Sequence, residues 1–335
     1  MTARVALAIL GAALVAAPFV LSDYLLSVLI VALYFAYAGQ AWNVMMGFAG
    51  QLSLGHALYV GLGAYAAAAL FVRLGIPPWI GAVAAVLVAM AIAAVIGFLA
   101  FRFRIAGVYF ALLTIAFAEF TRIGFDHFGW VGASAGLFLP VSQRAGSDLL
   151  ALRGTPTMFY YVILALAALA LALSRHLLKS RTGYYWLAIR EDQDAAEALG
   201  IDTFRYKMAA VLVSAALTAV AGVFFAFYNN NLFPEQIFSI GRSIEIILGP
   251  IIGGLGTLIG PILGAFVLQF LAEALREGVA ALGLEIPGLT QVFYGLCLLV
   301  VVMFLPHGIR PPLARRLRLR APFSSSRASP RASAD

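Results

Sequence analysis

Long apolar runs are the feature that most constrains this chain. A helix needs about 20 consecutive, predominantly apolar residues to cross a hydrocarbon core of roughly 30 Å, and several runs reach this length. The sequence therefore predicts an all-α polytopic membrane protein with about ten transmembrane helices. The predicted segments are 5–22, 24–46, 57–73, 78–101, 107–125, 157–174, 207–228, 243–259, 260–276 and 288–305.

The composition agrees with a membrane location. Hydrophobic residues make up 63% of the 335 residues and charged residues 11%, against roughly 25% charged in a soluble domain. The single cysteine, Cys297, lies in an apolar run and is interpreted as a small packing residue. The sequence shows no nucleophile–base set, no paired carboxylates and no His/Cys metal spacing. It predicts no enzyme activity, no metal site and no cofactor on this chain.

Positive charge predicts the orientation, because Lys and Arg accumulate on the cytoplasmic side of membrane spans. Placing both termini in the cytoplasm puts most of the 22 Lys and Arg residues there, including those of the loop 175–206. We expect one transmembrane domain over 1–310. The basic tail over 311–335 is predicted to be disordered and to contact anionic lipid rather than nucleic acid.

Two Gly-rich tracts, 47–65 and 249–265, occupy corresponding positions in the two halves of the chain. Interrupted segments at matching positions often line the midplane pathway of transporters built from repeats. Glycine also permits close helix crossings, and a lone His such as His56 is often structural, so both interpretations stay open. The pathway candidates in these tracts are Gln51, Ser53, His56, Gly253, Gly254, Gly256 and Thr257.

Polar residues within the apolar runs are costly and are therefore candidates for function. Thr114 and Glu119 are added to the pathway candidates for this reason. The alternatives are that Thr114 bonds a carbonyl of its own helix and that Glu119 pairs with Arg122, three residues further on. Glu245 has the same spacing from Arg242 and is interpreted as an ion pair.

The loop 175–206 is the one long interior interruption that carries charge of both signs. A charged, helix-forming element between two blocks of spans predicts a contact with a soluble partner. Asp192 or Asp194 can cap a short helix that Gly200 ends, with Ala195, Ala196 and Leu199 as its outward apolar face. The predicted coupling residues are Arg190, Glu191, Asp194, Ala195, Ala196, Glu197, Leu199 and Gly200.

The sequence contains no GxxxxGK[ST] phosphate loop, since neither Lys179 nor Lys207 follows the required Gly-rich segment. If ATP drives this protein, the nucleotide must be bound by partner subunits. The loop 175–206 is then the segment through which ATP hydrolysis on the partner subunits would act on this chain.

Several motifs follow one another in an order and spacing that resemble a known family. They are GQLSLGHALYVGLGAYAAA (50–68), GVYFALLTIAFAEFTR (107–122), SRTGYYWLAIREDQDAAEALGID (180–202), GGLGTLIGPILGAF (253–266) and LPHG (305–308). Together they resemble the branched-chain amino-acid ABC transporter permeases, M-type (the LivM family), over about residues 30–310. In the coupling loop, Asp194-Ala195-Ala196 and Gly200 are spaced like the EAA-x-x-x-G element of ABC importers, with Asp in place of Glu. One departure is the external loop, where a usual Thr-Gly-Gly-x-x-Gly-Leu element reads Val-Gly-Ala-Ser-Ala-Gly-Leu at 131–137.

The resemblance implies a permease subunit of an ABC importer in the bacterial inner membrane. Its implied partners are a second, H-type permease, two ABC ATPase subunits and an extracytoplasmic solute-binding protein. The implied substrates are leucine, isoleucine and valine; related permeases carry urea, short amides or aromatic acids. An alternative from another class is an ion-coupled secondary carrier that uses Glu119 or His56.

Overall fold

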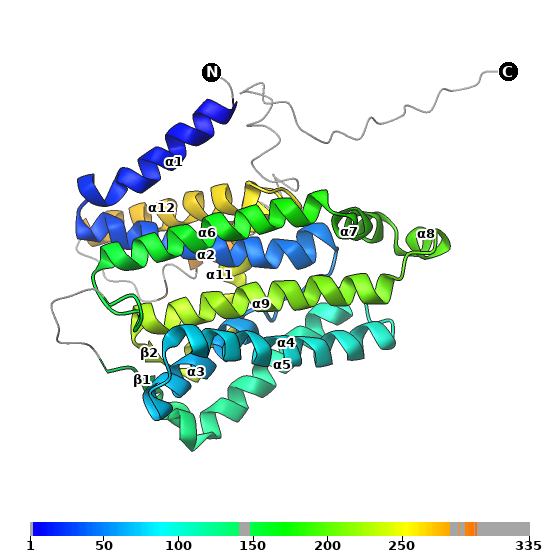
Figure 1. Cartoon of the computed structure of the whole chain (residues 1–335), viewed down its shortest axis with the longest axis horizontal. Coiled ribbons are helices and arrows are strands. Elements are labelled where there is room, and N and C mark those ends of the chain that lie inside the picture. Colours follow the sequence, from blue (N-terminus) through cyan, green and yellow to red (C-terminus); the bar gives the residue numbers. More distant parts are fainter. Residues whose placement is uncertain (1–2, 141–147, 282–287, 289–291, 298, 300–335) are drawn as a thin grey trace.

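The chain forms a bundle of long helices with one small two-stranded element at an end of the bundle (Figure 1). The computed structural model describes residues 3–140, 148–281, 288, 292–297 and 299. The α-helices are α1 (Ala3–Val20), α2 (Asp23–Asn43), α3 (Ala57–Leu74), α4 (Pro78–Arg102), α5 (Val108–His127), α6 (Pro156–Lys179), α7 (Arg181–Glu191), α8 (Gln193–Ala198), α9 (Thr203–Asn229), α10 (Pro234–Ile237), α11 (Ile240–Gly253) and α12 (Gly260–Ala281). The remaining elements are the π-helix η1 (Val44–Phe48), the 3-10 helices η2 (Gly129–Val131) and η3 (Ala133–Ala135), and the antiparallel strands β1 (Leu137–Phe138) and β2 (Asn231–Leu232).

The predicted fold class, an all-α polytopic membrane protein, is confirmed. Among the described residues, seven helical segments are long and apolar enough to cross a membrane, rather than ten. Of the other three predicted segments, 5–22 forms α1, and 260–276 forms part of α12, which carries Glu273, Arg276 and Glu277 in its second half. The last, 288–305, lies almost wholly outside the described residues, as do LPHG and the predicted tail 311–335.

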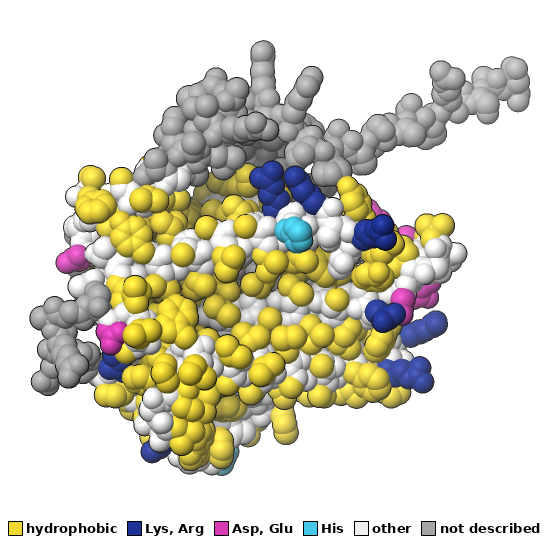
Figure 2. All heavy atoms as spheres, viewed as in Figure 1, with side chains coloured by type: hydrophobic (Ala, Val, Ile, Leu, Met, Phe, Trp, Pro, Cys, Tyr) yellow, Lys and Arg dark blue, Asp and Glu magenta, His cyan; other side chains and the backbone are white. Residues whose placement is uncertain are grey.

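Small residues allow the central helices to pack closely. One face of α4 repeats a small residue every fourth position, and these residues are all buried: Gly81, Ala85, Ala89, Ala93 and Gly97. This face meets α3 and α9, and the opposite face exposes large apolar side chains such as Leu87 and Phe98. Figure 2 shows such apolar side chains covering the visible face of the bundle, with charged groups gathered toward its ends. The pattern is typical of a lipid-facing helix packed through small residues.

The helices α3 and α9 touch through their backbones. A Cβ atom on Gly222 would lie 2.0 Å from the Val60 carbonyl oxygen, and one on Gly63 would lie 2.2 Å from the Ala219 carbonyl oxygen. Neither position therefore accepts a side chain without separating the helices. This contact places α3 and α9 at the centre of the structure, beside α2.

Neither Gly-rich tract is a plain helix. In the first tract, η1 ends at Phe48 and α3 begins at Ala57, with a non-helical segment between them. In the second, α11 ends at Gly253 and the chain is non-helical until Gly260, so the predicted segment 243–259 is interrupted in its Gly-rich part. The cause is backbone geometry, since Gly254 and Gly256 have φ of +116° and +70°, values that end a right-handed helix.

The charged loop is also shorter than predicted. Because α6 continues to Lys179 and α9 begins at Thr203, only residues 180–202 connect these helices. The charged residues 175–179 and 203–206 belong to the ends of α6 and α9, and the connecting residues themselves form α7 and α8.

The α3–α9 contact gives a test of the packing. We expect Gly222→Ala to destabilise the folded protein by about 1–3 kcal/mol, because the new methyl group overpacks the contact with Val60. Thermal unfolding in detergent measures this loss. The control is Gly124→Ala in α5, where a Cβ atom would meet nothing within 4 Å; unfolding of both variants at the wild-type temperature would contradict the close contact.

Candidate functional site

The residues between α6 and α9 form two short helices that their own side chains cap. The Ser180 hydroxyl accepts the backbone N–H of Gly183 at 3.4 Å, and the Asp192 carboxylate accepts that of Ala195 at 3.0 Å. Gly200, just beyond α8, has φ of +82°, which glycine adopts at little cost. The predicted Asp cap and Gly stop are therefore confirmed.

The outward face of α8 differs from the prediction. Leu199 is 82% exposed and Asp194 and Ala195 are exposed, but Ala196 is only 2% exposed. Placing Ala196 on the outward face is wrong, because its methyl group faces the bundle. The exposed members of the predicted coupling set within and beside α8 are Glu191, Asp194, Ala195, Glu197, Leu199 and Gly200.

A chain of hydrogen bonds fixes α8 to the start of α9. The buried Lys207 ammonium donates to the side-chain oxygen Oε1 of Gln193 at 2.9 Å. The side-chain NH2 group of Gln193 in turn donates to the Glu197 carboxylate at 3.0 Å. The Thr203 hydroxyl donates to the same carboxylate at 2.5 Å. The Thr203 and Gln193 hydrogen bonds hold the pKa of Glu197 below its ordinary value, so this carboxylate stays charged.

The helix α7 is anchored on the bundle by Trp186. This side chain is fully buried, and its indole N–H donates to the Tyr206 carbonyl at 2.7 Å. It packs in one apolar cluster with Val44 and Phe48 of η1, and Leu258 of the second interrupted segment lies against the same cluster. The helix therefore rests on both interruptions and on α9.

Arg190, at the end of α7, touches both Gly-rich tracts. Its Nη1 donates to the Gly47 carbonyl oxygen at 2.7 Å, and its Nη2 pairs with Glu191 at 2.5 Å. A Cβ atom on Gly256 would lie 2.5 Å from the Arg190 Nη1, and one on Gly50 would lie 3.0 Å from its Cγ. The Arg190 guanidinium thus lies where a Cβ atom on Gly256 would crowd it, and its aliphatic stem lies where a Cβ atom on Gly50 would crowd it. We call this group, Arg190 with Gly47, Gly50 and Gly256, the arginine junction.

Asn43, the last residue of α2, also contacts the arginine junction through Gly256. Its side-chain amide donates to the Thr257 carbonyl at 3.0 Å, and its oxygen accepts the Gly256 backbone N–H at 2.9 Å. One amide side chain thereby satisfies one backbone N–H and one backbone carbonyl of the interrupted segment. The sequence reasoning missed Asn43, although an amide within an apolar run was a signal that could have found it.

Gly253 and Gly254 have a packing role of their own. A Cβ atom on Gly253 would lie 1.7 Å from the Gly260 carbonyl oxygen. The end of α11 is therefore in backbone contact with the start of α12. These two predicted pathway residues lie at that contact, while Gly256 and Thr257 lie at the arginine junction.

His56 lies in a serine cradle in the interior. The ring is fully buried; its Nε2 lies 3.0 Å from the Ser214 hydroxyl and its Nδ1 lies 3.4 Å from the Ser53 hydroxyl. Ser214 donates to the Ala41 carbonyl at 2.7 Å, so it accepts from Nε2, which carries the proton. Both ring nitrogens therefore have partners, which agrees with the structural interpretation of this histidine.

Thr114 and Gln51 hold the first interrupted segment in place. The Thr114 hydroxyl donates to the Ala111 carbonyl of its own helix at 2.7 Å, as the alternative interpretation predicted. It also accepts the backbone N–H groups of Leu54 and Gly55 at 3.1 and 3.2 Å. The Gln51 amide donates to the nearby Ala49 carbonyl at 2.9 Å. These contacts satisfy backbone groups that lack helical partners.

Glu119 does not join the polar interior. Its side chain is 53% exposed and pairs with Arg122 at 2.6 Å; Arg122 also pairs with Asp126 at 2.7 Å. The ion-pair alternative for Glu119 is therefore confirmed, as is the predicted pair of Arg242 with Glu245 at 2.9 Å. Within the part of the chain that the structure describes, no three His, Cys, Asp or Glu side chains lie close enough to hold a metal ion.

The loop after α5, which departs from the family pattern at 131–137, carries backbone strain. Ala133 stands where the pattern has its second glycine and has φ of +48°. A non-glycine residue in this conformation costs roughly 1–2 kcal/mol. The loop is held by the pairing of Leu137 with Leu232, so β1 and β2 fix its end against the connection that follows α9.

Comparisons with known proteins agree with this architecture. A family model described as "Branched-chain amino acid transport system / permease component" matches residues 24–302. The LivM permease of Escherichia coli K12, named for high-affinity branched-chain amino acid transport, is 28% identical over 91% of this chain and 74% of its own length. The corresponding Salmonella typhimurium protein is 28% identical over 92% and 75%. The LivH permease of E. coli K12 is 32% identical over 44% of this chain and 45% of its own. No solved structure matches.

The arginine junction gives a test that needs no assay of activity. Arg190→Met keeps the stem but removes the hydrogen bond to the Gly47 carbonyl; a hydrogen bond to a charged group contributes about 1.5–3 kcal/mol. We expect amide hydrogen exchange in 44–56 and 254–259 to rise by about tenfold or more. The control is Arg205→Met, because Arg205 is 82% exposed and contacts Asp202 only at 3.8 Å. Equal exchange in both variants would show that Arg190 does not hold the two segments.

Proposed function

The chain belongs to the branched-chain amino acid transport permease family, and on that premise we propose that it is the M-type permease of an importer for leucine, isoleucine and valine. The family match over 24–302 carries this proposal. The LivM relatives of E. coli and Salmonella typhimurium match 91% and 92% of this chain and the LivH relative of E. coli matches 44%, which supports the M-type assignment. The chain is a multi-pass membrane protein and a transport component rather than an enzyme.

The proposed assembly consists of this chain, an H-type permease, two ABC ATPase subunits and an extracytoplasmic binding protein, in the bacterial inner membrane. The lack of a phosphate loop in the sequence supports ATPases on separate polypeptides. The ion pair of Glu119 and the serine cradle of His56 leave neither group free as a coupling ion site, which favours ATP over an ion gradient.

We place α7 and α8 on the cytoplasmic side, as the positive-inside rule predicts. A cleft of about 550 Å³ lies beside α8 and is lined by charges of both signs, including Arg102, Arg104 and Asp194. With the exposed Leu199, it offers a partner both an apolar tip and ionic contacts. A shift of α7 would act through Arg190 on both interrupted segments. The coupling role thus extends from α8 to the arginine junction.

Reconstitution tests the function directly. Proteoliposomes that contain all the proposed subunits, with ATP inside and binding protein outside, are expected to accumulate labelled leucine, isoleucine and valine. This chain alone should neither hydrolyse ATP nor accumulate these solutes. Preferred uptake of urea, a short amide or benzoate by the full assembly would reassign the substrate; gradient-driven uptake by the chain alone would overturn the ATP-driven assembly.

Leu199 tests the contact with the ATPases. Leu199→Asp places a carboxylate on the exposed tip of α8, and an apolar anchor lost from an interface costs about 2 kcal/mol or more. We expect the ATPases to stop co-purifying and uptake to fall by about tenfold or more. Leu199→Met should behave as wild type.

A second control is Leu74→Asp, at the opposite end of the bundle, where the side chain is 61% exposed. This variant should keep its ATPases. Normal co-purification and uptake with Leu199→Asp would remove α8 from the proposed interface.

A further inference from the structure

A cavity of about 300 Å³ lies at the end of the bundle opposite α7 and α8. It is formed by the first half of α2, the last turns of α9, the β2–α10 connection and the first turn of α11. Along α9, the lining residue Phe224 lies 21 residues beyond Thr203, which is next to α8, so this part of the cavity is about 32 Å from α8. None of its lining residues belongs to the predicted pathway set. Its size is in the range of small-molecule sites.

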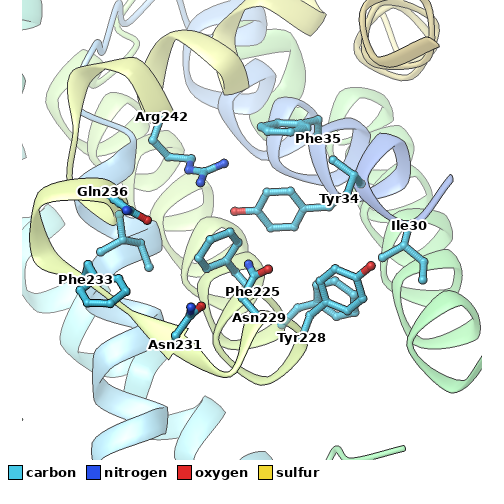
Figure 3. A pocket seen from close by; sticks show the side chains of 13 residues that line it. Ile30, Tyr34, Phe35, Phe225, Tyr228, Asn229, Asn231, Phe233, Gln236 and Arg242 are labelled. Carbon is cyan, nitrogen blue, oxygen red and sulfur yellow. The ribbon is translucent and has the colours of Figure 1, made fainter. Parts of the chain in front are cut away.

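Two buried hydrogen-bond donors in this cavity have no partner among the described residues. Tyr34 is 4% exposed, and its hydroxyl accepts or donates no hydrogen bond within the described part of the chain. The Nε of Arg242 is likewise buried and without a described partner. Figure 3 shows the Tyr34 hydroxyl and the Arg242 guanidinium pointing toward the same space. Buried polar groups are normally satisfied, so two such donors facing one cavity indicate an acceptor that binds there.

Both side chains are held rigidly in these positions. The Tyr34 ring packs edge-on to Phe35 and lies 5.8 Å from the ring of Phe225, between centroids. The Arg242 guanidinium lies 4.8 Å above the same Phe225 ring, and its Nη1 is bonded to Glu245 at 2.9 Å. The donors are therefore preorganised, which lowers the entropy lost when an acceptor binds.

The lining defines the chemistry of the ligand. A hydroxyl and a guanidinium N–H match the two oxygens of a carboxylate. The rings of Phe224, Phe225 and Tyr228 form an apolar wall beside them. The lining also includes three amide side chains, Asn229, Asn231 and Gln236, whose oxygens can accept from an ammonium group (Figure 3).

We propose that this cavity binds the carboxylate of a small aliphatic amino acid through Tyr34 and Arg242, as a receiving site at the outward end of the permease. The inference rests on the proposed import function and names the group of the substrate that the chain recognises. Glu245 offsets the charge of Arg242, so the site suits a zwitterion with one carboxylate better than a multivalent anion.

Equilibrium binding to the purified membrane assembly in nanodiscs, with both permeases and the ATPases but without the binding protein, tests this site without transport. The probes are labelled leucine and isocaproate, which has the carboxylate and the aliphatic chain but no ammonium group. Isoamylamine, which has the ammonium group but no carboxylate, is the competitor that should fail. We expect Tyr34→Phe to weaken binding of both probes by about tenfold, since it removes one hydrogen bond to a charged acceptor.

Tyr37→Phe is the matched control, because Tyr37 lies on the same helix and its hydroxyl donates to the Leu217 carbonyl at 2.8 Å. This variant should bind both probes as wild type. Arg242→Gln is made together with Glu245→Gln, because a carboxylate left buried and unpaired would destabilise the fold. The double variant should lose isocaproate binding.

Wild-type binding by both Tyr34→Phe and the double variant, or competition by isoamylamine alone, would overturn the site even if leucine uptake persists. Binding of isocaproate that depends on Tyr34, in an assembly that imports no amino acid, would support the site and reject the import function. The two hypotheses therefore fail by different measurements.

Discussion

The Arg190 side chain brings together three segments that are far apart in the sequence: its guanidinium, at the end of α7, donates a hydrogen bond to the Gly47 carbonyl and lies against Gly256. Inside an apolar bundle no water satisfies the backbone where a helix is interrupted, and each unsatisfied group costs several kcal/mol. The described part of the chain has two such interruptions, and side chains supply hydrogen-bond partners there: Arg190 and Asn43 at the arginine junction, and Thr114 at Leu54 and Gly55. The interruptions are therefore specified features of the fold.

The same contacts explain why the glycines lie where they do. Gly50 and Gly256 leave room for the Arg190 side chain, and Gly222 lets α9 reach the backbone of α3. A helix end that meets another backbone, or a guanidinium that fits between two backbones, tolerates no Cβ atom. Close packing and interruption of a span therefore occur together at these glycines, because each interruption lies where the chain closely approaches another segment.

The sequence predicted those structural features that depend on the residues of one continuous segment. Apolar length predicted the spans, and Asp192 and Gly200 predicted the ends of α8, because a bilayer and a helix cap act locally. Sequence-based prediction was incomplete for features that depend on contacts with a distant part of the chain. Ala196 faces inward because Gln193 and Thr203 fix α8 against α9. The Gly-rich tract 249–265 predicted an interrupted segment, but the residue at which α11 ends depends on the positive φ of Gly254 and Gly256. Tyr34 and Arg242 are separated by about 200 residues along the chain, and only the packing of α2 against α11 shows that they face one cavity.

The cavity and the arginine junction are built on the same two helices, α2 and α11. α2 carries Tyr34 in the cavity and Asn43 at the arginine junction, nine residues apart, and α11 carries Arg242 in its first turn and ends at Gly253. A helix transmits displacement along its axis because each turn is hydrogen-bonded to the next. A change in the position of α7 would therefore move the C-terminal ends of α2 and α11, which lie near the arginine junction. A ligand between Tyr34 and Arg242 would contact the parts of the same helices that line the cavity. Coupling between the two sites requires that each site bind its partner with different affinity in two arrangements of this helix pair, since a ligand shifts an equilibrium only by its differential affinity for the two states.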